Sequence, residues 1–444
     1  NLIAAAEHPL LIDLETLFNP EFERFDESEA YLEAQRTMLN SVLVAGMLPQ
    51  RLWSGDDYGG LDISGFGGEE GQLTPDRLPR PEGLGTDEMH YIREQLELSG
   101  EANRPRLDGV AVSPLDHIED VIGGFRELYH LLVAHREALL DVDGPLERFA
   151  EDEVRVLIRP TRTYDQLLFE SFHPDTLHDA LDRDLLFDRL WLVLPGRPHM
   201  APVITAEQED LQRGDIPVFT TRPASLELES GSGEIISGFL TETGISLARA
   251  RIKQLGDQDL QRQEWFIRSS LATLSPYEFG ISEPLKPSYR LAESAPQIGR
   301  EKLLKCAHAV ADRLVETAVL GEEDVCWLGL DMLPGASWDI SPVGMNLYSG
   351  VPGIALFLAY AGAILEEERY TDLARRGLNG MLRHIERFGD DLPGIGGFDG
   401  WGGTLYTLTN LGILWDDTAV LAQAEDVVDI LANFIEEDDL FDVM

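Results

Sequence analysis

A repeated segment near the end of the chain constrains the fold more than any other feature of the sequence. The stretch LYSGVPGIALFLAYAG at 347–362 is followed by GFDGWGGTLYTLTNLG at 397–412. Gly350 and Gly400 hold the same place in the two copies, and each is followed by another glycine three residues later. An apolar run long enough for a helix comes next in both copies. A glycine-marked loop that recurs at this period and leads into a helix predicts a helical array or an α/α toroid.

The two copies suggest that the array is incomplete, because two repeats rarely bury a full core. The chain opens with NLIAAAEHPL, without an initiator Met, and ends with FIEEDDLFDVM inside a helix-like pattern. We therefore expect the sequence to be a fragment of a longer protein.

Acidic residues dominate the charge of the chain. Its 444 residues include 80 Asp and Glu against 35 Lys and Arg, which gives a net charge of −45. Such a field repels nucleic acid and anionic membranes, so neither is expected as a partner. We interpret the acidic surface as an adaptation to a salt-rich cytoplasm, which is also the predicted location. A positively charged peptide substrate is the alternative explanation.

Several other functional classes are excluded by simple patterns. Cys306 and Cys326 are the only cysteines, and neither lies in a CxxC pair, so a disulfide scaffold or a zinc site built within the chain is not expected. No apolar run reaches about 18 residues, so no membrane span is predicted. No secretion signal opens the chain. His308 lies on an apolar helical face and is predicted to be a core residue.

The periodicity divides the chain into a long mixed part and a helical part. Helical patterns are predicted from Ser28 to Met47, within 114–150, in two helices after residue 164, and again after residue 242. Residues 52–108 are rich in Gly, Pro and acid, and are predicted to be an exposed insertion with weak strands. Residues 275–297 combine prolines with a loss of periodicity and form the predicted linker. The predicted domains are therefore 1–290 and 298–444.

The stretch RVLIRPTRTY, Arg155 to Tyr164, holds three arginines in an acidic chain. It is predicted to be a strand followed by a turn. Arg155, Arg159 and Thr161 share a face of a strand, and the two arginines would also share a face of a helix. Adjacent guanidinium groups repel each other unless an anion or carboxylates lie between them. The stretch therefore indicates either an anion site or arginines that pair with acidic residues.

Several stretches together resemble the class II lanthipeptide synthetases, which dehydrate Ser and Thr of a precursor peptide and join the products to Cys thiols. The opening NLIAAAEHPLLIDLETLF is similar to the dehydratase catalytic segment of that family, and RVLIRPTRTY is similar to its Arg-x-x-x-Arg-x-Thr segment. FHPDTLHDALDRDLLFDRLW, QEDLQRGDIPVF and DLQRQEWFI match further stretches of the family. The two glycine repeats resemble the first repeats of its lanthionine cyclase toroid. The resemblance runs nearly end to end, and 52–108 is its least matched part.

The resemblance implies a fold and a set of site residues. The expected fold is α+β and mostly helical: a kinase-like dehydratase C-lobe with helical additions, then the first repeats of an α/α toroid. Asn1 and Asp13 are implied to bind Mg²⁺ and, through it, ATP; carboxylate and amide oxygens suit that ion. Arg155 and Thr161 are implied to act in phosphate elimination, with Arg159 as a further member of that site. Arginine and a hydroxyl group suit a departing phosphate.

The resemblance also implies parts that this sequence lacks. A nucleotide-binding lobe is expected before residue 1, and the Zn²⁺ ligands of the cyclase are expected beyond residue 444. The implied partner is a leader-bearing precursor peptide, and an association with a peptide exporter is a further expectation. Two alternatives stay open: a kinase-cyclase of a related lanthipeptide class, and a degenerate synthetase that binds the precursor without modifying it. We expect the fragment alone to be incomplete for activity.

Overall fold

The computed structural model divides the chain into two compact units. It describes residues 28–52, 61–62, 64–68, 72–73, 77–83, 85–86, 90–98, 104–159, 161–172, 176–194, 198–274, 299–333, 337–388, 395–398 and 400–434. Unit 1 comprises residues 1–24 and 119–265, of which the described part begins at residue 119. Unit 2 comprises residues 25–118 and 266–444, so the chain leaves this unit and returns to it.

A four-stranded antiparallel sheet lies at the centre of unit 1. Its strands run in the order β12-β11-β10-β9. Their bounds are β9 Val154–Val156, β10 Phe219–Thr221, β11 Leu228–Ser230 and β12 Ile235–Ile236. Side chains alternate between the two faces of a strand, and in β9 both valines are buried whereas Arg155 is exposed. One face of the sheet therefore carries the core, and Arg155 points away from it.

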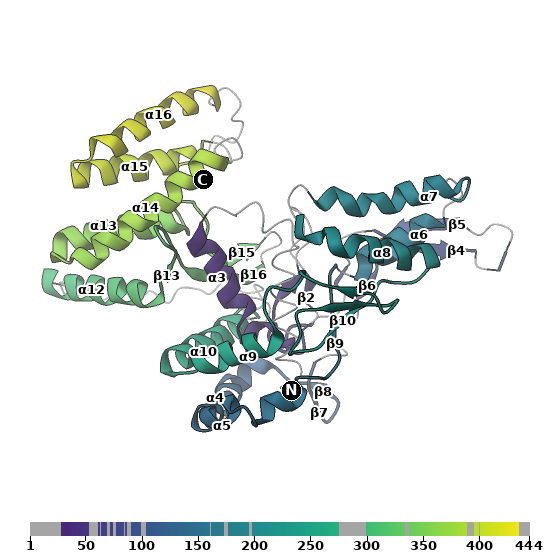
Figure 1. The fold of residues 1–444 in the computed structure, drawn as a ribbon. Coiled ribbons are helices and arrows are strands. Elements are labelled where there is room, and N and C mark those ends of the chain that lie inside the picture. The colour runs from purple at the N-terminus through teal and green to yellow at the C-terminus, as the bar shows by residue number, and fades with distance from the viewer. Residues whose placement is uncertain are drawn as a thin grey trace. The chain divides into compact units, whose positions relative to one another are not determined.

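Three helices complete this core, and Figure 1 shows them as neighbours. They are α6 (Thr161–Ser171), α7 (Ala180–Phe187) and α8 (Ala201–Arg213), with short 3-10 turns η5 (Asp188–Val193) and η6 (Pro198–Met200) between the last two. In α8 the buried positions recur at helical spacing, with Val203, Ile204 and Leu211 on the inner face. Glu207 lies on this same face and is fully enclosed. A carboxylate in that position needs a buried partner.

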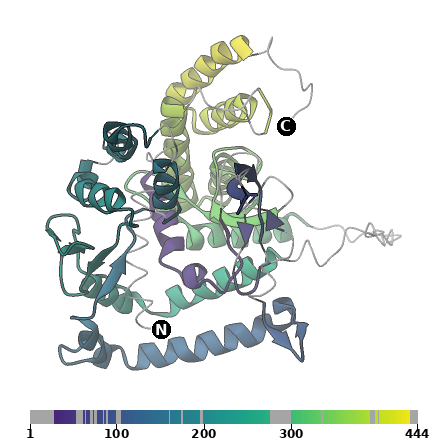
Figure 2. The ribbon, with the colours of Figure 1, turned by 90° about the vertical axis from the view of Figure 1, so that its right-hand side faces the viewer.

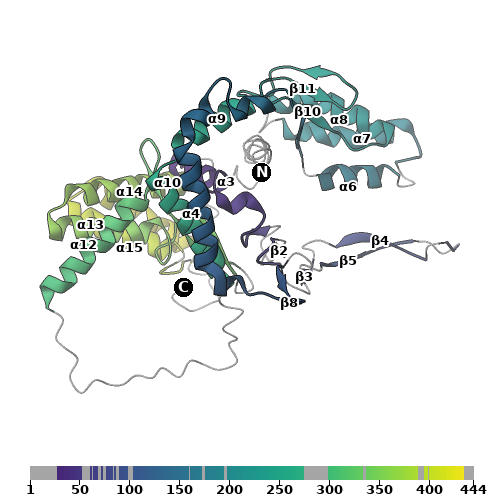
Figure 3. The same cartoon turned by 90° about the horizontal axis from the view of Figure 1, so that it is seen from below.

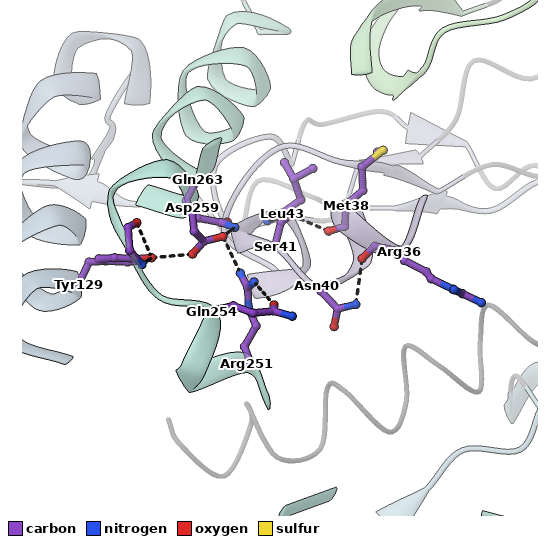
Figure 4. Close-up of polar contacts among 11 residues, drawn as sticks. Arg36, Met38, Asn40, Ser41, Leu43, Tyr129, Arg251, Gln254, Asp259 and Gln263 are labelled. Atoms are coloured by element: carbon purple, nitrogen blue, oxygen red, sulfur yellow. Dashed lines mark hydrogen bonds and ion pairs between the residues drawn. The ribbon is translucent and has the colours of Figure 1, made fainter. Parts of the chain in front are cut away.

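Helix α4 (Ile118–Ala134), the long blue helix at the bottom of Figure 2, runs beside α10 (Asp257–Ala272), as Figure 3 shows. The Tyr129 hydroxyl donates a hydrogen bond of 2.7 Å to the Asp259 carboxylate and accepts one of 2.9 Å from the Gly256 N–H. The side chains of Gln263 and Arg251 also donate to Asp259, and Figure 4 shows this network. The remaining helical segments of unit 1 are α5 (Arg136–Leu140), η4 (Pro145–Phe149) and α9 (Gly244–Gln254).

Stacked helices form the C-terminal part of unit 2 (Figure 1). They are α12 (Arg300–Thr317), α13 (Val351–Leu365), α14 (Glu368–Phe388), α15 (Trp401–Trp415) and α16 (Thr418–Phe434). The pairs α13–α14 and α15–α16 are hairpins, and α13 packs directly on α15. A continuous core of Leu, Ala, Tyr and Trp side chains runs through the stack. The predicted helical array is confirmed.

The repeat is visible residue by residue in these two hairpins. Gly350 caps α13 and Gly400 caps α15, both in an extended backbone conformation. The helices end at Glu366 and Asp416, which both take the left-handed conformation, with φ of 58° and 51°. The Tyr360 hydroxyl donates a hydrogen bond of 3.0 Å to the Asn410 side chain, which holds the equivalent position in the next repeat. Equivalent positions thus have equivalent backbone geometry, as a stacked repeat requires.

Helix α3 (Glu29–Leu39) belongs to unit 2, where it packs against β13 (Val319–Leu320), β14 (Val325–Cys326) and β16 (Ser337–Pro342). These strands lie far from α3 in the sequence, since Ala30 and its hydrogen-bond partner Asp324 are 294 residues apart. Its first turn is capped by the Ser28 hydroxyl and by the buried Asp324 carboxylate, which accepts a hydrogen bond of 3.1 Å from the Ala30 N–H. Asp324 lies between β13 and β14. Beyond the helix, the Ser41 hydroxyl caps the turn η1 (Val42–Ala45), as Figure 4 shows.

The described strands of unit 2 form short antiparallel pairs. The longest is β15 (Leu328–Leu333) with β16 (Ser337–Pro342). The pairs before α4 are β1 (Arg51–Leu52) with β2 (Leu61–Asp62), β3 (Gln72–Leu73) with β6 (Glu97–Leu98), β4 (Leu78–Glu82) with β5 (His90–Glu94), and β7 (Arg106–Leu107) with β8 (Val110–Ala111). A 3-10 turn, η3 (Pro114–His117), leads from β8 into α4. The strands from β2 to β7 lie within 52–108, where weak strands were predicted, whereas β8 and the pair β15–β16 lie outside that range.

The predicted α+β, mostly helical class is confirmed, while the kinase-like lobe stays a prediction. The predicted helix from Ser28 to Met47 ends early, at Leu39, because Asn40 and Ser41 bond to the last carbonyls of α3. The predicted linker at 275–297 lies outside the described residues, so the division at 290 and 298 also stays a prediction. Among the described helices, none is long and apolar enough to cross a membrane.

Candidate functional site

The stretch RVLIRPTRTY is a strand only at its start. Strand β9 ends at Val156, and α6 begins at Thr161, so the predicted strand face shared by Arg155, Arg159 and Thr161 does not form. The prediction fails because the pairing of β9 with β10 ends at Val156, opposite Phe219, and the chain becomes helical from Thr161. Arg155 and Arg159 consequently have very different surroundings.

Arg159 is held by a buried carboxylate. Its guanidinium group donates two hydrogen bonds to Glu207 of α8, of 2.8 Å from Nε and 3.1 Å from one terminal nitrogen. The side chain of Glu207 is 0% exposed and that of Arg159 is 13% exposed. This two-pronged geometry is the strongest that arginine makes with a carboxylate. Arg159 therefore neutralises Glu207 and ties the segment after β9 to α8.

Tyr164 of α6 completes this cluster. Its hydroxyl donates a hydrogen bond of 2.6 Å to Glu207, and the ring is 3% exposed. Burial raises the pKa of Tyr164 and the negative charge of Glu207 raises it further, while the positive charges of Arg159 and Arg155 act in the opposite direction. Tyr164 therefore stays protonated and donates to Glu207. Three elements, the segment after β9, α6 and α8, are joined at one carboxylate.

Arg155 and Thr161 are the exposed members of the predicted site. Arg155 is opposite Thr220 in the β9–β10 ladder, on the open face of the sheet. Thr161 is the first residue of α6 and is exposed. The first N–H groups of a helix lack partners within the helix and favour an anion nearby. One exposed guanidinium group and one exposed hydroxyl at a helix start are thus available to a negatively charged group.

The predicted magnesium ligands, Asn1 and Asp13, lie outside the described residues. Within the described ranges, no group of three or more His, Cys, Asp or Glu side chains is placed to hold a metal ion. Cys306 is exposed and Cys326 is buried, and burial raises the pKa of the Cys326 thiol to about 12. Cys326 is therefore a packed, protonated side chain.

Comparison with known families accounts for most of the chain. The family described as "Domain of unknown function (DUF4135)" matches residues 1–222, and the family "Lanthionine synthetase C-like protein" matches residues 341–444. The two matches lie one after the other along the chain, and the second covers its C-terminal part. The chain belongs to the class II lanthipeptide synthetases. The second match covers both glycine repeats, so the helical hairpins are the toroid repeats that the sequence predicted.

A relative that is named as a biosynthesis protein supports this assignment. The "Lacticin 481/lactococcin biosynthesis protein LcnDR2" of Lactococcus lactis subsp. lactis is 24% identical in an alignment of 379 residues, and the alignment covers 81% of this chain. The chain spans 38% of the length of that relative. The match with the first family also includes α3, which the structure places in unit 2 together with the toroid repeats.

Two residues of the cluster around Arg159 were missed by the sequence analysis, Tyr164 and Glu207. A signal for Glu207 exists in the segment APVITAEQEDLQR, where it falls on the apolar face of α8, between Ile204 and Leu211. An acidic residue on an apolar helical face indicates a buried cation partner. No comparable signal marks Tyr164, because a tyrosine at helical spacing is an ordinary core residue.

Proposed function

We propose that the chain is part of a synthetase that dehydrates Ser and Thr of a precursor peptide and then adds Cys thiols to form lanthionine rings. Dehydration would proceed by ATP-dependent phosphorylation of the hydroxyl and elimination of the phosphate. The support is the family membership together with one contrast in the structure: Arg159 is committed to Glu207, while Arg155 is exposed. An exposed arginine is what a transient phosphate group requires.

The proposed elimination assigns separate tasks to these residues. A base removes the proton from Cα of the phosphorylated residue, the electron pair forms the Cα–Cβ double bond, and the Cβ–O bond breaks as phosphate leaves. Arg155 donates to the phosphate oxygens as their charge increases, and Thr161 adds a hydroxyl donor. Arg159, Tyr164 and Glu207 hold the chain between β9 and α6 in place. Arg155 and Thr161 therefore act on the leaving phosphate rather than on the Cα proton.

The cofactors of the proposed reaction are ATP with Mg²⁺ for phosphorylation and Zn²⁺ for thiol addition. Asn1 and Asp13 are the proposed contacts of this chain with Mg²⁺, and the zinc ligands are proposed to lie outside it. Bound Mg²⁺ would offset the charge of the transferred phosphoryl group, and Zn²⁺ would favour the thiolate form of the attacking Cys. A cytoplasmic location and an exporter partner remain expectations.

An elimination assay tests the proposal directly. The full-length protein is incubated in high salt, without ATP, with a leader-bearing peptide already phosphorylated on one Ser, and loss of phosphoric acid is followed by mass spectrometry. Arg155→Ala should slow elimination about a hundredfold, as loss of a donor to a developing anion does. Arg222→Ala is the matched control, because Arg222 is an exposed arginine that follows β10 and pairs with Glu151 on the surface.

Each result of this assay has a defined meaning. Elimination that is lost with Arg155→Ala and kept with Arg222→Ala supports the proposed site. Equal rates in both variants and in the unaltered protein would contradict the role of Arg155. Peptide binding without any elimination by the unaltered protein would favour the alternative of a non-catalytic scaffold.

A further inference from the structure

A groove lies on the outer side of the two toroid repeats. It has a volume of about 760 Å³ and lies between α14 and α16, with Leu408 of α15 in its lining. Leu382, Ile385, Val427 and Ile430 complete the apolar part of the lining. All of these elements belong to unit 2. The groove is far along the chain from Arg155 and is not part of the proposed elimination site.

The stacking of the hairpins explains why the groove exists. Helices α13 and α15 pack directly on each other, whereas α14 and α16 pack mainly on their own hairpin partners. When the helices on one side of a row of hairpins are closer together than those on the other side, the row is curved. The helices on the outer side of the curve are then further apart. The space between α14 and α16 is therefore a consequence of the curvature of the array.

One wall of the groove is fixed by contacts to the β13–β14 turn. From α14, Arg376 donates to the carbonyl oxygens of Gly321 and Glu322, at 3.2 and 3.1 Å. Asn379 and Arg383, one and two turns further along the helix, bond to the carbonyl oxygen and the carboxylate of Glu323. The two guanidinium groups in the groove are thus already engaged by the protein itself.

Two of the carboxylates in the groove do not pair with a described cation. The lining contains Glu322, Glu323, Glu386 and Asp426 against the two arginines. Arg383 pairs with Glu323, and in the described part of the chain no cation pairs with Glu386 or Asp426. Glu386 projects from α14 and Asp426 from α16, so the two walls each present a free negative charge beside apolar side chains.

We propose that this groove binds a segment of the peptide substrate that carries Lys or Arg next to apolar side chains. The apolar lining would bury the aliphatic side chains, and Glu386 and Asp426 would select the positive charges. The proposal rests on the proposed function for the identity of the peptide. A peptide that must reach two reaction sites in turn benefits from a third contact, which keeps its local concentration high between the steps.

Binding of a defined probe to the full-length protein tests the groove. The probe is a fluorescein-labelled 12-residue peptide of Lys, Leu and Ser, and its analogue has Glu in place of every Lys; both are followed by fluorescence anisotropy at low salt. The double variant Glu386→Lys/Asp426→Lys should weaken binding of the Lys probe about tenfold. The Glu analogue should bind the unaltered protein weakly.

Two further variants make the test specific. Asp372→Lys/Glu425→Lys makes the same change in net charge on α14 and α16, at exposed carboxylates outside the groove, and should leave affinity within about twofold. Gln423→Trp places a large ring at an exposed position of the groove wall without changing charge, and should weaken binding at every salt concentration. Circular dichroism checks that each variant is folded.

The outcomes separate this proposal from the proposed function. Loss of binding in the groove variants, with normal binding in the control pair, supports the groove. Equal loss in both pairs, or no loss in either, overturns it. Elimination of phosphate from a short phosphopeptide without basic residues should be unchanged in all groove variants, so a failure of Arg155→Ala to slow that reaction would contradict only the proposed function.

Discussion

The chain contains two clusters in which an arginine and a tyrosine bind one carboxylate, and the surroundings of the two clusters differ. In unit 1, Arg159 and Tyr164 bind the carboxylate of Glu207, whose side chain is 0% exposed. In unit 2, Arg369 and Tyr370 bind the carboxylate of Asp312, whose side chain is 35% exposed. The Nδ1 atom of His308, which carries a charge only when the ring is protonated, lies 3.0 Å from Oδ2 of Asp312. The comparison shows that an arginine and a tyrosine can bind a carboxylate either inside the core or at the surface.

The physical difference between the clusters is the access of water. A buried carboxylate that loses its partners cannot be rehydrated, so its charge becomes a large penalty. A carboxylate at the surface keeps part of its hydration, and salt screens its attraction to the cation. Removal of one partner should therefore destabilise unit 1 strongly at Glu207, whereas at Asp312 it should only weaken the packing of α12 against α14.

The largest predicted effect is the loss of Arg159. Arg159→Ala leaves the Glu207 carboxylate buried without its cation and should destabilise unit 1 by about 3–5 kcal/mol. Urea denaturation at fixed high salt measures this loss. The triple variant Arg159→Met/Tyr164→Phe/Glu207→Leu removes all three polar groups together and should recover most of the stability. A triple variant as unstable as Arg159→Ala would show that the cluster itself is needed for the fold.

The next predicted effect is a loss of stability in alkaline solution. Burial, together with a hydrogen bond to a carboxylate, raises the pKa of Tyr129 and of Tyr370 to about 12. Because the pKa is higher in the folded chain than the ordinary value of about 10, the stabilisation is complete below pH 10 and is lost as the pH rises to about 12. Thermal unfolding from pH 8 to 12 measures it. The variants Tyr129→Phe and Tyr370→Phe should each flatten this decline, and an unchanged decline in both would contradict the assignment.

A smaller effect is expected at Asp324, which is fully buried but makes one hydrogen bond, to the N–H of Ala30, through one of its two oxygens. Asp324→Ala removes a cap of α3 and should cost about 1 kcal/mol. Asp324→Asn keeps the acceptor and removes a buried charge, so it should be at least as stable as the unaltered chain. Urea denaturation of the two variants compares them. If Asp324→Asn loses more than Asp324→Ala, the carboxylate charge itself stabilises α3.

The sequence predicted the repeats better than the sites. The equivalence of Gly350 and Gly400 predicted the helical repeats, because repeats with the same backbone conformation carry similar residues at the same positions. The shared strand face of Arg155, Arg159 and Thr161 was wrong, because the local pattern does not show that the pairing of β9 with β10 ends at Val156. The pairing of Arg159 with an acidic residue was considered, but its partner is 48 residues away and was not identified.

His308 shows the same limit in unit 2. Its position on an apolar helical face predicted a core residue, but its side chain is 40% exposed and faces Asp312 and Glu367. The prediction is wrong because Glu367 belongs to the loop between α13 and α14, and a helical pattern within α12 alone cannot show where that loop lies. Long-range polar pairs are set by tertiary packing, which the periodicity of a single segment does not contain.

The smallest predicted effect concerns Asp312, and it sharpens the contrast with Glu207. The hydrogen bond from Tyr370 and the charge of Arg369 lower the pKa of Asp312 against the opposing effect of desolvation. Its stabilisation is therefore present above the ordinary carboxyl pKa of about 4 and is lost only as the pH falls below it. Asp312→Asn should lower the melting temperature slightly at neutral pH and low salt, and the difference should vanish at molar salt. A loss that equals that of Arg159→Ala and persists in salt would mean that exposure does not separate the two clusters.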